Sequence, residues 1–148
     1  MEDHTYDALL LENQLCFPLY AASREVIKRY RPYLDELDLT YTQYVAMMVL
    51  WAEEQISVKE LGQRLYLDSG TLTPVLKNLE SKGYITRHRS HEDERVLLAG
   101  LTEEGRALRD RAIEVPRQMA GCIHLEPADA GQLYALLYKL LGSIEPEA

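Results

Sequence analysis

The chain has 148 residues and a hydrophobic fraction of 47% without low-complexity stretches, which predicts one folded domain and excludes a disordered chain. No apolar run approaches the roughly 20 residues of a membrane-spanning helix, and the acidic N-terminal stretch lacks the positive start of a signal peptide, so we expect a cytoplasmic protein without a membrane segment. Two cysteines far apart argue against a structural disulfide, and the net charge of −8 argues by itself against nucleic-acid binding.

The charge is unevenly distributed along the chain. Between positions 57 and 89 there are six Lys and Arg residues and three Asp and Glu residues, a local surplus of three. The remainder of the chain therefore carries a net charge of −11. This asymmetry allows the middle of the chain to bind an anion while the rest keeps the protein soluble.

The first third of the chain is predicted to be helical. Residues on one face recur at intervals of three and four, which is typical of a helical stripe. Pro18 lies inside this run, lacks an N–H and presses on the carbonyl of Gln14, so we expect the helix to kink there or to begin late, and we prefer the kink. The stripe consists of Leu9, Asn13, Cys16, Tyr20, Ser23, Ile27, Tyr30 and Leu34.

The next three helices carry recognisable start and stop signals. Residues 40–43 (TYTQ) have the pattern of a capping box that opens a strongly apolar core helix, and residues 57–60 (SVKE) have the same pattern for a second helix. A third helix is expected to begin near Gly70 and to end at Lys82 and Gly83. Its buried stripe consists of Leu72, Val75, Leu76 and Leu79.

Two strand-like runs follow, at residues 84–87 and 96–101, and the charged loop HRSHEDER between them predicts a hairpin. Helical sequence then runs from Thr102 to about Ala120, with an expected kink at Pro116. After a loop around Cys122 a last helix starts at Pro127, with Leu133, Leu136, Leu137 and Leu140 expected to face inward. The predicted class is mainly α with a small β-hairpin.

Two short helices followed by a charged hairpin have the pattern of a winged helix-turn-helix. Short hydroxyls at the start of the second helix reach base edges or phosphates, and basic residues contact the DNA backbone or a narrow minor groove. The alternative is a solvated hairpin on a helix-turn-helix that binds no DNA. The candidate DNA contacts are Ser69, Thr71, Thr73 and Lys77 on the helix and Arg87, Arg89 and Arg95 on the hairpin.

Cys16 allows two interpretations. A lone cysteine in an apolar helix is usually a small core residue. Tyr20, however, lies one turn away on the same face, and polar Asn13 and Ser23 share the stripe. Tyr30 is fourteen residues further, about 21 Å along the helix axis, so it reaches Cys16 only if the helix bends sharply or if an antiparallel partner helix brings it there.

The block from Glu60 to Gly105 resembles the winged-helix core of the MarR family of bacterial transcription regulators, including the Asp93-Glu94-Arg95 wing signature and the LTEEG that follows. The stretches LENQLCFPLYAASRE, LTYTQYVAMMVLW and LYLDSGTLTPVLK are similar to the organic-hydroperoxide-sensing (OhrR) branch of that family. The similarity covers nearly the whole chain and is weakest after about Ala120.

The resemblance implies a homodimer that binds a pseudo-palindromic operator in double-stranded DNA. It implies one domain over residues 6–145, with dimerisation helices at 6–37 and 102–145 around a winged helix-turn-helix at 40–101. It further implies that Arg95 makes the wing contact and that Asp93 braces it.

For the sensor, the resemblance implies that Cys16 of one subunit is hydrogen-bonded by Tyr20 and Tyr30 of the other and is oxidised by an organic hydroperoxide to sulfenic acid. Cys122 suggests the two-cysteine type, in which an inter-subunit Cys16–Cys122 disulfide forms. The alternative is that Cys122 is an incidental surface thiol in a tolerant loop.

The function that these features indicate is a repressor that releases its operator when a hydroperoxide oxidises Cys16. A repressor released by a small aromatic ligand is the first alternative, and a thiol peroxidase is a lower one. No enzyme activity and no cofactor are expected. His88 and His91 on the wing lack further metal ligands in the sequence, so no metal site is expected either.

Overall fold

The computed structural model describes residues 4–144. Two short 3₁₀ turns, Asp7–Leu9 and Leu11–Asn13, precede the first helix, and position 145, the last of the expected domain, lies outside the described residues. The elements are α1 (Cys16–Asp35), α2 (Tyr41–Glu53), β1 (Gln55–Ser57), α3 (Val58–Leu65), α4 (Ser69–Ser81), β2 (Ile85–Arg89), β3 (Leu97–Leu101), α5 (Glu103–Ala112), α6 (Glu114–Met119) and α7 (Pro127–Ser143).

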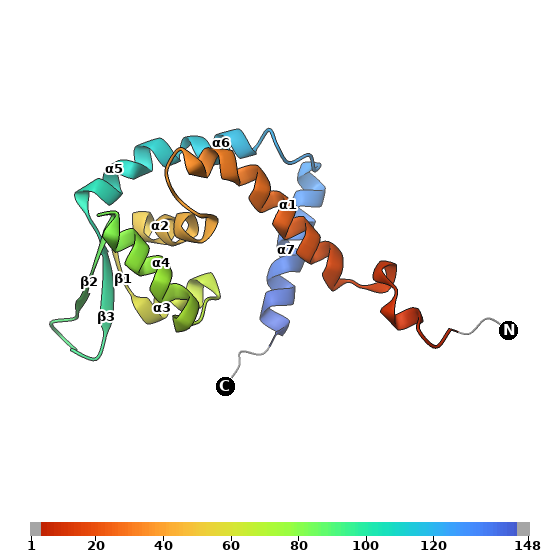
Figure 1. Cartoon of the computed structure of the whole chain (residues 1–148), viewed down its shortest axis with the longest axis horizontal. Helices are drawn as coiled ribbons and strands as arrows, with labels where there is room; N and C mark the ends of the chain where they lie inside the picture. Colours follow the sequence, from red (N-terminus) through yellow and green to blue (C-terminus); the bar gives the residue numbers. More distant parts are fainter. Residues whose placement is uncertain (1–3, 145–148) are drawn as a thin grey trace.

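The middle of the chain forms a winged helix-turn-helix, as expected (Figure 1). β2 and β3 form the predicted hairpin; each strand starts one residue later than expected and β2 ends two residues later. β1 adds a third strand on the far side of β3, so the sheet order is β1-β3-β2. The sequence analysis missed β1 because three residues are too few to show alternation. Ile56 of β1 is nevertheless buried and lies opposite Ala99.

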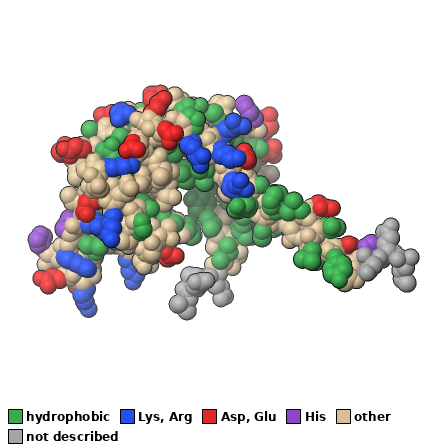
Figure 2. All heavy atoms as spheres, in the orientation of Figure 1, with side chains coloured by type: hydrophobic (Ala, Val, Ile, Leu, Met, Phe, Trp, Pro, Cys, Tyr) green, Lys and Arg blue, Asp and Glu red, His purple; other side chains and the backbone are tan. Residues whose placement is uncertain are grey.

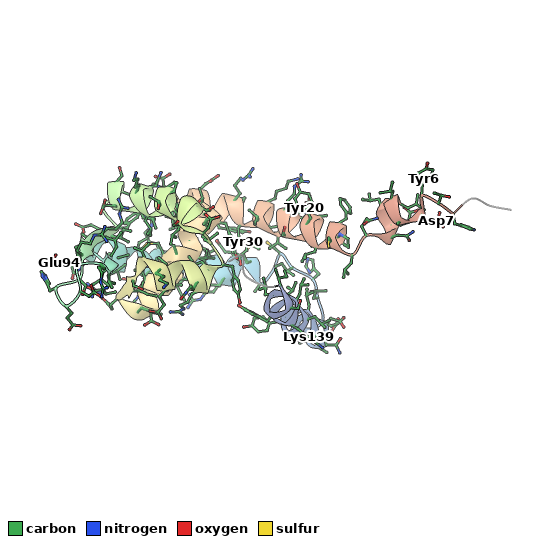
Figure 3. All side chains as sticks on the ribbon, turned by 90° about the horizontal axis from the view of Figure 1, so that it is seen from below. Tyr6, Asp7, Tyr20, Tyr30, Glu94 and Lys139 are labelled. Carbon is green, nitrogen blue, oxygen red and sulfur yellow. The ribbon has the colours of Figure 1, made fainter. Side chains whose placement is uncertain are left out.

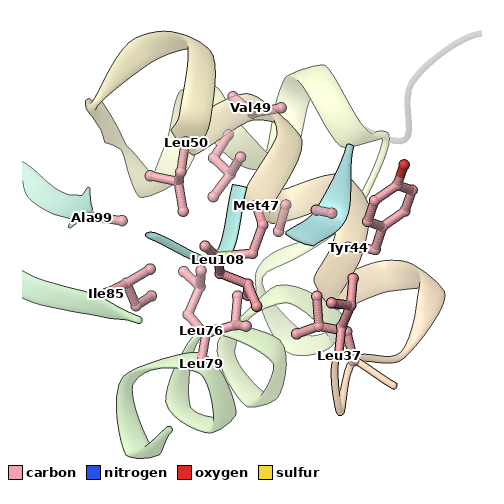
Figure 4. Packing of buried hydrophobic residues seen from close by; sticks show 14 of the residues in the cluster. Leu37, Tyr44, Met47, Val49, Leu50, Leu76, Leu79, Ile85, Ala99 and Leu108 are labelled. Carbon is pink, nitrogen blue, oxygen red and sulfur yellow. The ribbon is translucent and has the colours of Figure 1, made fainter. Parts of the chain in front are cut away.

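The hydrophobic core lies between α2, α4 and the sheet (Figure 4). The predicted stripe of α4 is buried at Leu72, Leu76 and Leu79, which are each at most 1% exposed. The start of α2 has the predicted capping box, because Thr40 accepts from the Gln43 N–H at 3.2 Å and Gln43 accepts from the Thr40 N–H at 3.1 Å. These local signals explain why the module folds as the sequence predicts.

The first helix begins late, at Cys16, which is the alternative that Pro18 left open, and the preferred kink at Pro18 is wrong. α1 is continuous from Cys16 to Asp35, and Pro18 is its third residue, where no intrahelical N–H is needed. Upstream, the Asn13 amide donates to the Asp7 carbonyl at 2.8 Å and the Gln14 amide donates to the Ala8 carbonyl at 2.6 Å. These side-chain bonds satisfy the backbone in 3₁₀ turns and compete with helix there.

The C-terminal third follows the prediction of a kink caused by Pro116 and departs from the prediction at α7. The helix after Thr102 is interrupted at Ile113, one turn before Pro116, because proline lacks the N–H that would bond the Ala112 carbonyl. The last helix starts at Pro127 as expected, but no residue of α7 is buried in the single chain, and Leu133 and Leu136 are 46% and 62% exposed. The expectation that they face inward is therefore wrong within one chain.

α1 extends away from the winged-helix module, and its Cys16 end and the preceding 3₁₀ turns lie farthest from it (Figure 1). α7 stands apart from both α1 and the module, as the turned view shows (Figure 3). Apolar side chains are exposed along this part of the molecule, as Figure 2 shows in green; they include Leu9, Leu15, Phe17 and Leu19. Among residues 4–144 no helix is long and apolar enough to cross a membrane.

Candidate nucleic-acid interface and thiol site

The start of α4 presents the short hydroxyl side chains expected of a recognition helix. Asp68 caps the helix by accepting from the Thr71 N–H at 2.7 Å, and this bond lowers the pKa of the Asp68 carboxyl. Ser69 and Thr71 are exposed, and Lys77 is exposed two turns along. Since the opposite face of α4 is buried, these side chains point to solvent together.

Thr73 is less free than the other two hydroxyls. It is half-buried, and its hydroxyl donates to the Ser69 carbonyl one turn back at 2.7 Å. Its oxygen remains available only as an acceptor. Of the three candidate hydroxyls on α4, Thr73 is therefore the one with the most restricted chemistry.

The wing carries an exposed arginine held by a carboxylate. Arg95 is 90% exposed at its side chain, and its guanidinium donates to both oxygens of Asp93, from Nε at 3.0 Å and from NH2 at 3.2 Å. This pair also lowers the pKa of Asp93. Arg89 is exposed on β2. Figure 2 shows one group of Lys and Arg side chains at the lower left over the wing and a second group at the upper centre of the view. The expected bracing of Arg95 by Asp93 is thus present in the geometry.

Arg87 lies differently from the other wing arginines. Its side chain is 19% exposed, its NH2 donates to Glu80 of α4 at 3.2 Å, and its backbone N–H donates to the same carboxylate at 2.9 Å. Its Nε atom is buried without a protein partner. This arrangement joins the recognition helix to the wing and leaves little of the guanidinium for a phosphate.

We expect replacement of Glu80 by glutamine to lower the thermal stability of the protein in a pH-dependent way. The hydrogen bond from Arg87 lowers the pKa of Glu80 below its ordinary value of 4.5. A lowered carboxyl pKa contributes stability that is present above the ordinary value and is lost as the pH falls through the folded-state value. Glu80→Gln should therefore have a lower melting temperature than the wild type at pH 7. Thermal unfolding should show the gap between the two melting temperatures closing below about pH 4. A gap of constant size would contradict this.

The thiol of Cys16 is exposed at the first residue of α1. The helix N-terminus carries partial positive charge, which favours an anion at that position. Tyr20, one turn along, is 57% exposed, and the Arg24 guanidinium lies 5.2 Å from the centre of its ring. The two residues that the sequence analysis grouped first, Cys16 and Tyr20, therefore both lie on the open outer end of α1.

Tyr30 lies at the other end of the helix, in an aromatic cluster that the sequence analysis missed (Figure 3). Its ring centre is 4.9 Å from that of Tyr41 and 6.0 Å from that of Tyr44, and burial raises the pKa of Tyr30. Because α1 is continuous, Tyr30 stays about 21 Å from Cys16 along the axis. The local signals at Tyr41 and Tyr44 indicated a helix start and a core residue, which hid their contact with α1.

The second thiol, Cys122, is half-buried and packs against the core. Its Sγ lies 3.5 Å from the hydroxyl oxygen of Tyr33 on α1 and donates to the Gln118 carbonyl at 3.5 Å. Sequence reasoning missed Tyr33, because it is 89 residues from Cys122 and lies off the predicted stripe.

An open apolar pocket of about 180 Å³ lies between α2 and the α5–α6 junction. Tyr44, which belongs to the aromatic cluster, also lines this pocket, and Arg109 supplies a charge at it. The remaining lining residues are Met48, Trp51, Ala112, Ile113 and Pro116. Met48 is 46% exposed here. Residues 4–144 contain no cluster of three or more His, Cys, Asp or Glu side chains suited to a metal.

Comparison with known proteins gives consistent similarities. Residues 28–112 match the family described as transcriptional regulator SarA/Rot. The chain is 49% identical over 142 residues to the organic hydroperoxide resistance transcriptional regulator of Bacillus subtilis, covering 96% of this chain and 97% of that protein.

Solved structures of AbfR, a protein of Staphylococcus epidermidis, share the fold. The reduced AbfR bound to DNA is 31% identical, with a TM-score of 0.77 over 94% of this chain and 95% of that one. The disulfide form is 33% identical, with a TM-score of 0.64 over 93% and 96%. The conformation described for this chain, in which both cysteines are free, is closer to the reduced DNA-bound form.

Proposed function

Because this chain belongs to the SarA/Rot family of MarR-like transcriptional regulators, we propose that it is a dimeric repressor that releases its operator when an organic hydroperoxide oxidises Cys16. Its relatives are transcriptional regulators and not enzymes. Because the proposed target is chromosomal DNA, we also propose that the protein is located in the cytoplasm.

For DNA binding, the proposal assigns α4 to the major groove and the wing to the backbone or minor groove. Ser69 and Thr71 are exposed at the positive end of α4, and Lys77 lies further along the same solvent face. Arg89 and Arg95 supply the wing contacts, and Asp93 fixes the direction of Arg95. Thr73 acts as an acceptor. Arg87 contributes as the tie between wing and helix rather than as a main contact.

For sensing, the proposal assigns the first oxidation step to Cys16. The thiolate sulfur attacks one oxygen of the hydroperoxide, the O–O bond breaks, the hydroperoxide is reduced to an alcohol, and the sulfur becomes sulfenic acid. The exposed position of Cys16 at the positive end of α1 supports this step.

The proposal requires a second subunit at the sensor. Within one chain the rigid length of α1 keeps Tyr30 away from Cys16, whereas an antiparallel α1 of a partner would bring Tyr30 to it. Exposed apolar side chains on the outer half of α1 and on α7 give such a partner a surface to cover, among them Phe17, Leu19, Leu133 and Leu136. Tyr30 then stabilises the partner's sulfur, Tyr20 lies one turn from Cys16 of its own chain, and Cys122 resolves the sulfenic acid.

The end of α1 is tied to the DNA-reading module, which gives oxidation a route to the operator. Lys82, at the end of α4, donates to the Asp38 carbonyl and to the Gln43 side chain at 3.3 Å. Arg111 of α5 donates to the Glu36 carbonyl at 2.6 Å. A displacement of α1 therefore moves the recognition helix, and two displaced recognition helices no longer match both half-sites.

The observation that carries the proposal is the exposed Cys16 at the first residue of α1. Figure 3 shows this end of α1, beyond Tyr20, on the side of the molecule opposite the wing with Glu94. An operator-shift titration tests it. We expect one equivalent of cumene hydroperoxide per subunit to weaken operator binding, on the order of 5- to 150-fold, and dithiothreitol to restore it. Each subunit should consume one equivalent of the hydroperoxide and no more. Unchanged affinity would contradict a redox repressor, and continuous peroxide consumption would indicate a thiol peroxidase.

A second candidate signal is a small aromatic ligand, which the apolar pocket beside Arg109 favours. Its aromatic and aliphatic lining suits a ring, and the guanidinium suits a carboxylate. The same titration separates the two signals, because salicylate as probe would release the operator without oxidant and dithiothreitol would not reverse it.

A further inference from the structure

The C-terminal half of α1 meets the segment after α6 at a contact that the proposed function leaves unused. The Tyr33 hydroxyl oxygen lies 3.5 Å from the Cys122 sulfur. The position of Cys122 is fixed from both sides, since its backbone N–H donates to the Met119 carbonyl at 2.9 Å and its side chain packs on the core. A cysteine in a loop is thus held at a defined place beside α1.

The protons at this contact have one consistent arrangement. The Cys122 S–H donates to the Gln118 carbonyl, so the sulfur accepts the hydrogen bond and the Tyr33 hydroxyl donates it. The bond to Cys122 is also the first cause of a raised pKa of Tyr33, with Glu36 adding to it, so the phenol keeps its proton at neutral pH. An O–H that points at sulfur stabilises negative charge on that sulfur.

The same geometry decides which thiol Cys122 meets. Tyr33 is seventeen residues beyond Cys16 on the continuous helix, so the two cysteines of one chain are separated by about 26 Å along its axis. A disulfide requires Cα atoms within about 7 Å. The reactive cysteine that approaches Cys122 therefore belongs to a second copy of the chain.

We propose that Tyr33 is a positioning residue that holds Cys122 and stabilises its thiolate while Cys122 attacks the partner's oxidised cysteine. The inference rests on the proposed function, in which Cys16 becomes a sulfenic acid. The Cys122 sulfur attacks the sulfenic sulfur, the S–S bond forms, the S–O bond breaks, and hydroxide leaves and takes up the thiol proton to give water. Two thiols are oxidised to a disulfide for each hydroperoxide reduced to alcohol.

The test separates the two oxidation steps in Tyr33→Phe, which loses only the hydroxyl. One equivalent of cumene hydroperoxide is added, sulfenic acid is followed by dimedone trapping, and the covalent dimer is followed on non-reducing gels. We expect the sulfenic acid to form at the wild-type rate and the disulfide to form about tenfold more slowly, since a hydrogen bond to a charged group is lost. The matched control is Tyr66→Phe, at an exposed tyrosine between α3 and α4, which should leave both rates unchanged.

A second measurement needs no disulfide. In the Cys16→Ser background, the rate of alkylation by iodoacetamide reports the thiolate at Cys122 directly. The rate is measured at a temperature at which both proteins are folded, and Tyr33→Phe should lower it severalfold. An unchanged or faster alkylation, or a disulfide rate equal to that of the wild type, would overturn the role of Tyr33. A wild type that forms no Cys16–Cys122 disulfide at all would instead overturn the resolving step of the proposed function.

Discussion

Replacing Arg95 by alanine is expected to weaken operator binding about 100-fold. The exposed guanidinium is the wing contact of the proposal, and Asp93 holds it in one orientation through two hydrogen bonds. Loss of one such contact costs roughly tenfold in affinity. Because a dimer has two wings, the loss occurs twice, and the slope of log affinity against log salt concentration should become less steep by about 2.

Fluorescence anisotropy with a labelled operator at several salt concentrations measures both quantities. Arg117→Ala is the matched control, because Arg117 is an equally removable exposed arginine that pairs with Glu114 on α6, away from the wing. The control should bind as the wild type does. If Arg95→Ala and Arg117→Ala bound equally well, the wing would not contact DNA.

Replacing Gly105 by alanine is expected to destabilise the fold by about 3 kcal/mol. A Cβ at this position would overlap the Tyr84 carbonyl oxygen and lie 2.9 Å from the Leu101 Cδ1 atom. The Tyr84 carbonyl is not free to move, because it accepts from the Thr102 N–H at 3.1 Å. The Gly105 carbonyl in turn accepts from the Trp51 indole N–H at 2.8 Å, which ties α2 to α5.

Urea unfolding at a fixed protein concentration measures the difference, since the stability of a dimer depends on concentration. Gly121→Ala is the control, because a Cβ there would meet only the Gln118 carbonyl oxygen at an ordinary 3.7 Å. It should change the free energy of unfolding by less than about 0.5 kcal/mol. A loss below 1 kcal/mol in Gly105→Ala would mean that the close approach of α5 to Tyr84 can relax.

The sequence predicts the elements whose signals are local. The capping box at Thr40, the leucine stripe of α4 and the hairpin are all read from residues within one turn or one strand of each other, and all three are present. The winged-helix fold and the regulator family are confirmed by the structure and by its relatives. The third strand, β1, escaped because its evidence is the pairing with β3 more than forty residues away.

Errors arose where side chains act beyond the local pattern. The apolar periodicity that starts at Leu9 predicts a helix from that residue. Asn13 and Gln14 instead bond to upstream carbonyls, so the helix begins only after them, at Cys16. On α7 the pattern found an apolar face correctly, yet a pattern carries no information on whether the chain itself or another copy covers that face.

The candidate sites divide in the same way. Residue type and spacing drew attention to Cys16 and the α4 hydroxyls, whereas the resemblance to the OhrR branch implied the sensor role of Cys16 and the bracing of Arg95 by Asp93. Residue type and charge made Arg87 and Arg95 equivalent candidates for DNA contact. In the folded chain, however, the Arg87 guanidinium donates to Glu80 of α4. The contact between Tyr33 and Cys122 joins α1 to the loop before α7. The two residues are 89 positions apart, so no local sequence pattern predicts the contact.

The measurement that tests the central claim most directly is the operator affinity of Cys16→Ser before and after one equivalent of cumene hydroperoxide. Serine keeps the shape of the exposed side chain and removes the oxidisable sulfur. We expect the variant to bind the operator as the reduced wild type does and to keep that affinity after oxidant, while the wild type releases. Release of Cys16→Ser to the same extent as the wild type would contradict the account.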